Sequence, residues 1–128
     1  MIVMRPIEEA AVLDELDAGR FGGAAGGLQG YVVMEGPRYH GHALYRVEDG
    51  VTTLLECALD ETPLVDGAAR ACVAAGENAG ARAFTVRAGD AALAGWLRIC
   101  CHGNTGNVPD LVPNDVLFAG CAGKKDGK

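Results

Sequence analysis

The sequence predicts an α+β layer sandwich with a mixed, mostly antiparallel central sheet, in the order β-α-β-β-β-α-β-α-β. Three β-rich segments lie between residues 31 and 59, separated only by short turn signals. Two segments, at 64–80 and 91–101, repeat apolar residues at close to the helical period. A helix that links two neighbouring strands acts as a crossover, so the strands on either side of 64–80 should run parallel.

The first elements are a short strand and an amphipathic helix. Ile2–Met4 is an apolar run just before Pro6, and residues 8–19 combine apolar positions with acidic residues weighted toward the start. Gly19 is a plausible helix stop. The glycine-rich stretch 21–27 is either a plain linker or a mobile loop beside a cleft. It lacks the Gly-Lys-Ser/Thr of a P-loop, so that class of nucleotide site is excluded.

A meander of three strands is predicted in the middle of the chain. The turn signals Gly36-Pro37 and Glu48-Asp49-Gly50 separate segments rich in β-branched, aromatic and apolar residues. Because these connections are short, neighbouring strands should pair antiparallel. The three segments cover residues 31–35, 42–47 and 51–59.

The C-terminal half adds two helices and two strands. A helix at 64–80 ends at Gly80 and leads to a strand at 82–87. Asp90 is expected to cap the helix 91–101, and Val116–Ala119 is predicted as the closing strand. Residues 1–121 should form one domain, and residues 122–128 a flexible basic tail.

Composition limits the partners and the location. The chain has 128 residues and a net charge of −6, which argues against nucleic acid because phosphate binding needs clustered Lys and Arg. No apolar run reaches the roughly 18 residues that span a bilayer, so no membrane association is expected. We do not expect the start of the chain to act as a signal peptide, and five cysteines do not suggest a disulfide framework. We expect a cytoplasmic protein.

A phosphate-bearing ligand is suggested by the helix that follows the third strand of the meander. Gly67-Ala68-Ala69 opens an alanine-rich segment soon after that strand. A helix entered at glycine can present free backbone N–H groups to an anion, and its dipole favours negative charge. This pattern predicts a nucleotide-like cofactor at the helix entry.

The order of elements, together with three local motifs, resembles the GNAT family of acyl-CoA-dependent N-acetyltransferases. Gly41-His42-Ala43 is similar to the family's Gly-x-Ala segment, and Asp49-Gly50 looks like its hairpin turn before the central fourth strand. The family's cofactor loop, Arg/Gln-x-x-Gly-x-Gly/Ala, corresponds to residues 64–69, in which Gly67 and Ala69 match. The resemblance extends to about residue 103 and implies a three-layer α/β/α fold.

The resemblance also implies an activity, a cosubstrate and a set of site residues. Such an enzyme transfers an acetyl or other acyl group from acyl-CoA, here acetyl-CoA, to a small-molecule or peptide amine. Glu56 is the candidate base for the attacking amine. The residues expected to bind the cosubstrate are Cys57, Ala58 and Leu59 for the pantetheine arm, and Gly67, Ala68 and Ala69 for the pyrophosphate.

Departures from the family pattern support an alternative, a degenerate non-catalytic member that binds a partner or another ligand. Leu64 stands where the family has Arg or Gln, and Asp60, Glu61 and Asp66 surround the loop with charges that repel phosphate. The helix 91–101 also lacks the tyrosine that often serves the family as an acid.

Other groupings are weaker. Cys100-Cys101-His102 with Cys121 could suggest zinc, but adjacent cysteines do not easily chelate one ion, so no metal is expected. His40 and His42 should share one face of a strand, either lining a substrate cleft or forming a solvated pair. A homodimer is a further possibility, because an exposed sheet edge favours cover by another chain.

Overall fold

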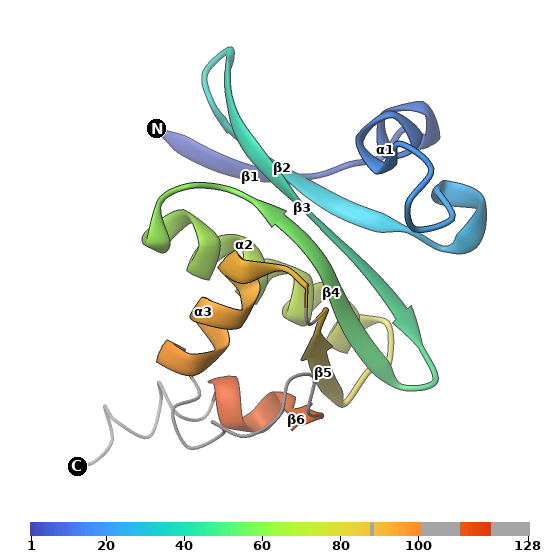
Figure 1. Cartoon of the computed structure of the whole chain (residues 1–128), viewed down its shortest axis with the longest axis vertical. Coiled ribbons are helices and arrows are strands. Elements are labelled where there is room, and N and C mark those ends of the chain that lie inside the picture. The colour runs from blue at the N-terminus through green and yellow to red at the C-terminus, as the bar shows by residue number, and fades with distance from the viewer. Residues whose placement is uncertain (88, 101–110, 119–128) are drawn as a thin grey trace.

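The computed structural model describes residues 1–87, 89–100 and 111–118. Up to α3 their elements follow the predicted order, with one short 3-10 helix added (Figure 1). In chain order they are β1 (Ile2–Pro6), α1 (Ala10–Asp17), η1 (Ala24–Gly26), β2 (Gln29–Glu35), β3 (Arg38–Glu48), β4 (Val51–Ala58), α2 (Thr62–Asn78), β5 (Ala83–Val86), α3 (Ala91–Cys100) and β6 (Val112–Pro113).

The strands form one mixed sheet in the order β1-β2-β3-β4-β5-β6. Neighbours pair antiparallel except β4 and β5, which run parallel because α2 carries the chain back between them. The predicted meander and the predicted parallel pair are therefore both confirmed.

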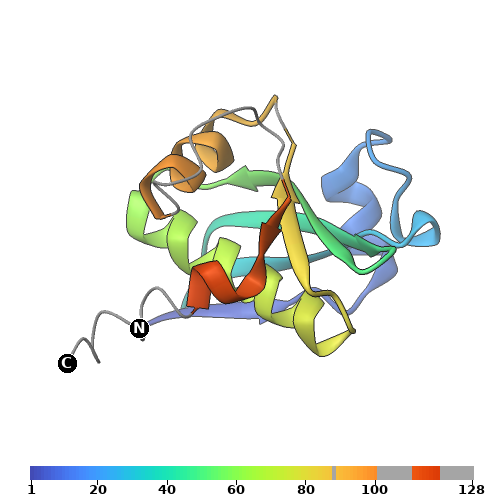
Figure 2. The ribbon, with the colours of Figure 1, turned by 90° about the horizontal axis from the view of Figure 1, so that it is seen from below.

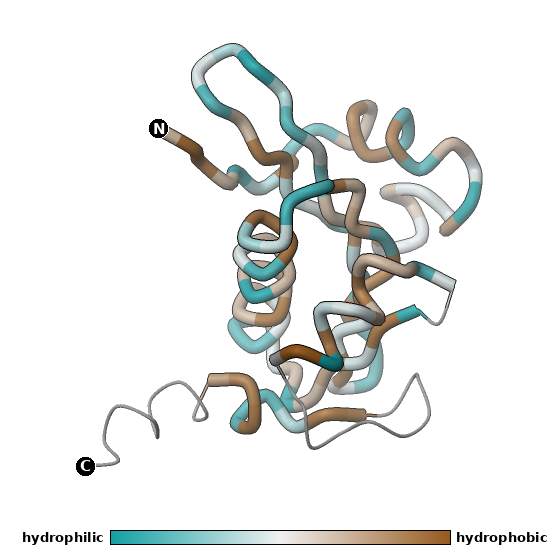
Figure 3. The backbone as a smooth tube through the Cα atoms, turned by 60° about the vertical axis from the view of Figure 1, so that its left-hand side comes forward, coloured by the Kyte–Doolittle hydropathy of each residue, from teal (hydrophilic) through white to brown (hydrophobic). Residues whose placement is uncertain are grey.

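Helices lie on both faces of this sheet (Figure 2). The larger core packs α2 and α3 against the strands, and a smaller core packs α1 and η1 against the opposite face. Leu54 and Leu55, consecutive on β4, belong to different cores, as strand geometry requires. The hydropathy colouring alternates along the helices, as expected for elements with one face in a core (Figure 3). The architecture is α+β and compatible with a three-layer α/β fold.

One irregularity in β4 shapes the middle of the sheet. Leu44 pairs with Glu56 while Tyr45 pairs with Leu54, so Leu55 is the extra residue of a β-bulge. Pairing between β4 and β5 stops at Leu54 and Val86, although β4 continues to Ala58. β5 ends at this point, so residues 55–58 of β4 have no paired strand on this edge. We call this region the β4–β5 split.

The predicted closing strand at Val116–Ala119 is wrong. The structure places a short strand, β6, at Val112–Pro113, and the described residues that follow it, 114–118, are helical. Asn114 fixes this change of direction, because its backbone N–H bonds to the Arg82 carbonyl and its side chain to the Ala81 carbonyl. Within the helical turn Leu117 is buried and Val116 is exposed, a pattern that a short apolar run does not reveal in sequence.

In the described ranges, no helix combines the length and apolar character needed to cross a bilayer. The predicted basic tail at 122–128 lies outside the described residues.

The contact between α2 and β4 yields a first prediction. Any side chain on Gly76 would overlap the Thr52 hydroxyl, and Thr52 is fully buried. Gly76→Ala should therefore destabilise the protein by at least about 2 kcal/mol, despite a gain of about 1 kcal/mol in helix propensity. Urea unfolding of the wild type and of Gly76→Ala measures this difference in the free energy of unfolding.

Gly95→Ala is the matched control, because Gly95 lies within α3 and a Cβ there meets nothing closer than 4.0 Å. It should be neutral or stabilising. Equal stability of the two variants would contradict the described packing of α2 on β4.

Candidate functional site

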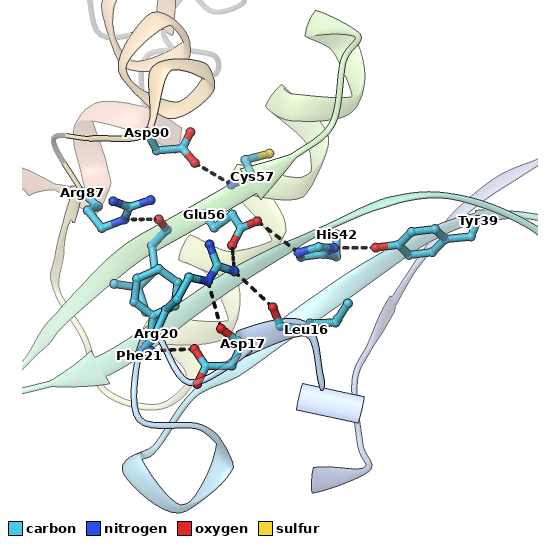
Figure 4. A network of polar contacts seen from close by, with 11 residues as sticks. Leu16, Asp17, Arg20, Phe21, Tyr39, His42, Glu56, Cys57, Arg87 and Asp90 are labelled. Carbon is cyan, nitrogen blue, oxygen red and sulfur yellow. Dashed lines mark hydrogen bonds and ion pairs between the residues drawn. The ribbon is translucent and has the colours of Figure 1, made fainter. Parts of the chain in front are cut away.

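The edge of β4 that faces the split is occupied by side chains of the segment after β5 (Figure 4). The Cys57 N–H donates to Asp90 Oδ2 at 3.1 Å, and Arg87 Nε donates to the Leu55 carbonyl at 2.7 Å. These two contacts satisfy a donor and an acceptor of β4 that β5 no longer reaches. The split is therefore closed by an arginine and a carboxylate rather than by strand pairing.

Asp90 also makes contacts at the start of α3. Its Oδ1 accepts the Leu93 N–H at 2.9 Å, and its carbonyl accepts the Ala94 N–H at 3.0 Å. The prediction that Asp90 caps this helix is confirmed. One carboxylate thus joins the helix cap to the Cys57 N–H.

Glu56 lies on the face of the sheet that α1 covers, together with three other polar side chains (Figure 4). Its Oε1 contacts Arg20, and its Oε2 lies 3.4 Å from His42 Nε2. The other ring nitrogen of His42, Nδ1, is hydrogen-bonded to the Tyr39 hydroxyl. We call these four residues the Glu56 cluster.

His42 is neutral at physiological pH. Its side chain is about 90% buried, and this burial lowers its pKa below the ordinary 6.5, although Glu56 acts in the opposite direction. The 3.4 Å approach to Glu56 lacks normal hydrogen-bond geometry, so His42 Nε2 is buried without a hydrogen-bond partner. Within the described part of the chain, Glu56 Oε2 accepts no hydrogen bond either.

The end of α1 holds Arg20 in place. Arg20 Nε and Nη2 donate to the carbonyls of Asp17 and Leu16, at 2.9 and 3.1 Å. The buried carboxylate of Asp17 accepts the Phe21 N–H at 2.6 Å, and Arg46 donates to the Phe21 carbonyl. The glycine-rich stretch after α1 is therefore anchored where it meets the sheet.

The predicted helix entry at Gly67 is wrong, because α2 begins at Thr62. Gly67, Ala68 and Ala69 lie in its second turn, where backbone N–H groups bond within the helix. Ala68 and Ala69 are buried, and a Cβ on Gly67 would lie 2.5 Å from Met4 Cε. These three residues pack α2 onto the sheet and present no free N–H to a pyrophosphate.

The true first turn of α2 is poor in N–H donors. The N–H groups of Leu64 and Val65 both bond to the Glu61 carbonyl, and Pro63 has no N–H. Asp60 and Glu61, immediately before this turn, are exposed acids. The start of α2 therefore repels a phosphate more than it attracts one.

The other predicted cosubstrate residues surround the split. The Cys57 N–H faces it, while the Cys57 thiol is buried in the larger core, where burial raises its pKa to about 12. Ala58 ends β4. Leu59 lines a cavity of about 220 Å³ between the start of α2 and α3, with Val65, Trp96 and Ile99 among its apolar walls.

His40 and His42 do not share one site. His40 Nε2 contacts Glu35 at 3.0 Å, whereas His42 faces Glu56. A second bulge, opposite Val33 and Met34, and the unusual backbone of Gly41, with φ of +152°, separate the two rings. The expected shared face fails because the strand is irregular at that point.

Three residues of the site were not predicted: Arg20, Tyr39 and Arg87. They come from the end of α1, the start of β3 and the end of β5, so no sequence spacing joins them. His42, by contrast, stands in the Gly-x-Ala motif and could have been weighed together with Glu56.

No cluster of metal-ligating side chains occurs among the residues that the structure covers. The group considered for zinc, Cys100, Cys101, His102 and Cys121, lies outside the described side chains. Comparison of the chain with models of known protein families and with curated proteins finds no match.

The buried His42 gives a pH prediction. Because its pKa is lowered in the folded state, the unfolded state binds more protons as the pH falls below 6.5. The His42 contribution to the free energy of unfolding should be fully present above pH 6.5 and should decrease as the pH falls toward the lowered pKa.

Urea unfolding at pH 7.5 and pH 5.5 tests this point. The wild type should lose more stability between the two pH values than His42→Gln, which has no imidazole to protonate. Equal losses would mean that His42 is not held neutral by burial.

Proposed function

We propose that this protein is an acyltransferase of the GNAT type, which transfers an acyl group from a thioester to an amine held by Glu56 and His42. One observation carries the proposal. Two polar atoms 3.4 Å apart, Glu56 Oε2 and His42 Nε2, both lack a hydrogen bond of normal geometry in the described chain. An amine nitrogen has enough hydrogen-bonding capacity to engage both.

The position of this pair supports acyl transfer rather than simple amine binding. Glu56 directly precedes Cys57, whose N–H points into the β4–β5 split and already binds a carboxylate oxygen. A thioester carbonyl is an acceptor of similar size, and its oxygen gains charge as an amine attacks. The split would hold the acyl donor, and the Glu56 cluster the acceptor, on adjoining residues of one strand.

The proposed step needs one proton acceptor. The amine nitrogen forms a bond to the thioester carbon, the carbon–sulfur bond breaks, and the thiolate leaves with its electron pair. Glu56 Oε2 takes the proton that the amine nitrogen loses, and this proton then neutralises the thiolate. Arg20 holds Glu56 in place from the other oxygen, and neutral His42 adds no competing positive charge.

The described residues fit one end of acyl-CoA better than the other. The split and the apolar cavity beside Leu59 and Trp96 suit an acyl-pantetheine arm. The start of α2 does not suit a pyrophosphate, since Asp60 and Glu61 flank it and Pro63 removes a donor. The donor would therefore be recognised mainly by its thioester and its pantetheine arm.

Calorimetric titration compares these two ends directly. S-acetyl-pantetheine and acetyl-CoA should bind with dissociation constants within about threefold of each other, because the nucleotide end gains no contact that favours it. Asp90→Ala should tighten both, since it frees the Cys57 N–H, provided circular dichroism shows that the variant folds.

A hundredfold preference for acetyl-CoA would contradict the assignment of the donor to its pantetheine end. Failure of both ligands to bind, in the wild type and in Asp90→Ala, would contradict acyl transfer itself.

A second candidate function, a non-catalytic binding domain, rests on the contact between Asp90 and the Cys57 N–H. If the Asp90 carboxylate never releases the Cys57 N–H, the split cannot bind a ligand. Its contacts then serve only to hold the sheet and α3 together. Binding of S-acetyl-pantetheine distinguishes the two candidates, because a permanently closed split has no place for it.

The role of Glu56 is tested by Glu56→Gln, which keeps the shape and removes the base. Acetyl transfer to a reactive amine should fall by about a hundredfold or more, with donor binding unchanged. His40→Gln is the matched control, because His40 contacts Glu35 and no member of the Glu56 cluster. Equal activity of wild type and Glu56→Gln would remove Glu56 from the mechanism.

A further inference from the structure

Arg87 lies beside the Glu56 cluster and makes two contacts there. Its Nε donates to the Leu55 carbonyl at 2.7 Å, and its guanidinium carbon lies 5.2 Å from the centre of the Phe21 ring. Leu55 directly precedes Glu56 along β4, and Phe21 directly follows Arg20, which contacts Glu56. Both anchors of Arg87 are thus chain neighbours of the proposed amine site.

No acid among the described residues forms an ion pair with Arg87. Among the described residues, the ion pairs of arginine are Arg20–Glu56 and Arg70–Asp66, and none involves Arg87. Its side chain is half-buried, and within the same described ranges its two terminal nitrogens have no hydrogen-bond partner.

The nearby acid, Asp90, binds backbone N–H groups with both of its carboxylate oxygens. One of its carboxylate oxygens accepts the Cys57 N–H and the other accepts the Leu93 N–H. Arg20 differs from Arg87 in this respect, because its guanidinium lies 4.9 Å from the same Phe21 ring but is neutralised by Glu56. Within the described residues, the terminal nitrogens of Arg87 form a forked set of open donors on this side of the sheet, whereas Arg46 uses one of its terminal nitrogens to bind the Phe21 carbonyl.

We infer that the acceptor is an amine that also carries a carboxylate, with the amine at Glu56 and His42 and the carboxylate on the terminal nitrogens of Arg87. This inference rests on the proposed acyl transfer and adds the class of acceptor: amino acids rather than neutral amines or polyamines. A guanidinium fork binds a carboxylate through two parallel hydrogen bonds, which supplies both orientation and selectivity.

Three pairs of acceptors test the inference and measure the spacing between the two groups: glycine, β-alanine and 4-aminobutyrate, each compared with its amide. For at least one pair the wild type should favour the acid over the amide by about 10- to 100-fold in kcat/KM. Arg87→Gln should abolish that preference, because it should lower the rates with the acids far more than the rates with the amides. Arg82→Gln, an exposed arginine just before β5, should keep it.

Each other result has a distinct meaning. A wild type that acetylates amides as well as acids, or an Arg87→Gln variant that slows both equally, would overturn the inference and leave the proposed acyl transfer standing. Transfer to none of the six acceptors, with S-acetyl-pantetheine still bound, would also overturn it. Absence of donor binding would remove the proposed function first, and this inference with it.

Discussion

The separation of β4 from β5 is the constraint on which the rest of the structure depends. The extra residue at Leu55 rotates the end of β4, so that Glu56 faces α1 while the Cys57 thiol enters the larger core. β5 ends at Val86 and cannot follow, which leaves N–H and carbonyl groups in need of partners in the middle of a sheet. Such groups are costly when buried, and Arg87 and Asp90 supply those partners. The bulge therefore sets the position of Glu56, and the end of β5 leaves the edge of β4 that Arg87 and Asp90 close.

Charge is distributed unevenly around this centre, although the chain as a whole is acidic. Acids gather at the start of α2, where they discourage phosphate, while arginines gather around Phe21 on the opposite face. Under the proposed function, the apolar thioester arm would lie on the side of α2 and α3, and the amine that carries a carboxylate on the side of α1. This division connects the proposed donor with the inferred acceptor.

Most of the fold could be predicted from sequence, because it depends on local patterns. The turn signals at Gly36-Pro37 and Asp49-Gly50 fixed the meander, and a helix between β4 and β5 required a parallel pair. The start of α2 was missed because Gly67 looked like an entry, whereas it is a close packing contact with Met4. The closing strand was misplaced because four apolar residues fit a strand and a helix equally well.

The site was harder to predict than the fold. Glu56 is singled out in the sequence because it lies on the strand that carries the family resemblance, and its role stays a prediction. Its partners Arg20 and Tyr39 come from distant elements, and only the bulge brings them to one face. Asp90 was expected as a helix cap, but its bond to the Cys57 N–H depends on a gap between strands that no sequence pattern encodes. Contacts that depend on irregular backbone can be identified only from the structure.

The most direct test of the central claim is the amide resonance of Cys57 during titration with S-acetyl-pantetheine. If the split opens for a thioester, this N–H exchanges Asp90 for the carbonyl of the ligand, and its proton and nitrogen shifts should move. The Leu93 amide should move with it, because the same carboxylate caps α3. Saturable shifts at both positions are the predicted result. Unchanged Cys57 and Leu93 resonances at millimolar ligand would contradict the account, because they would mean that the split stays closed and has only a structural role.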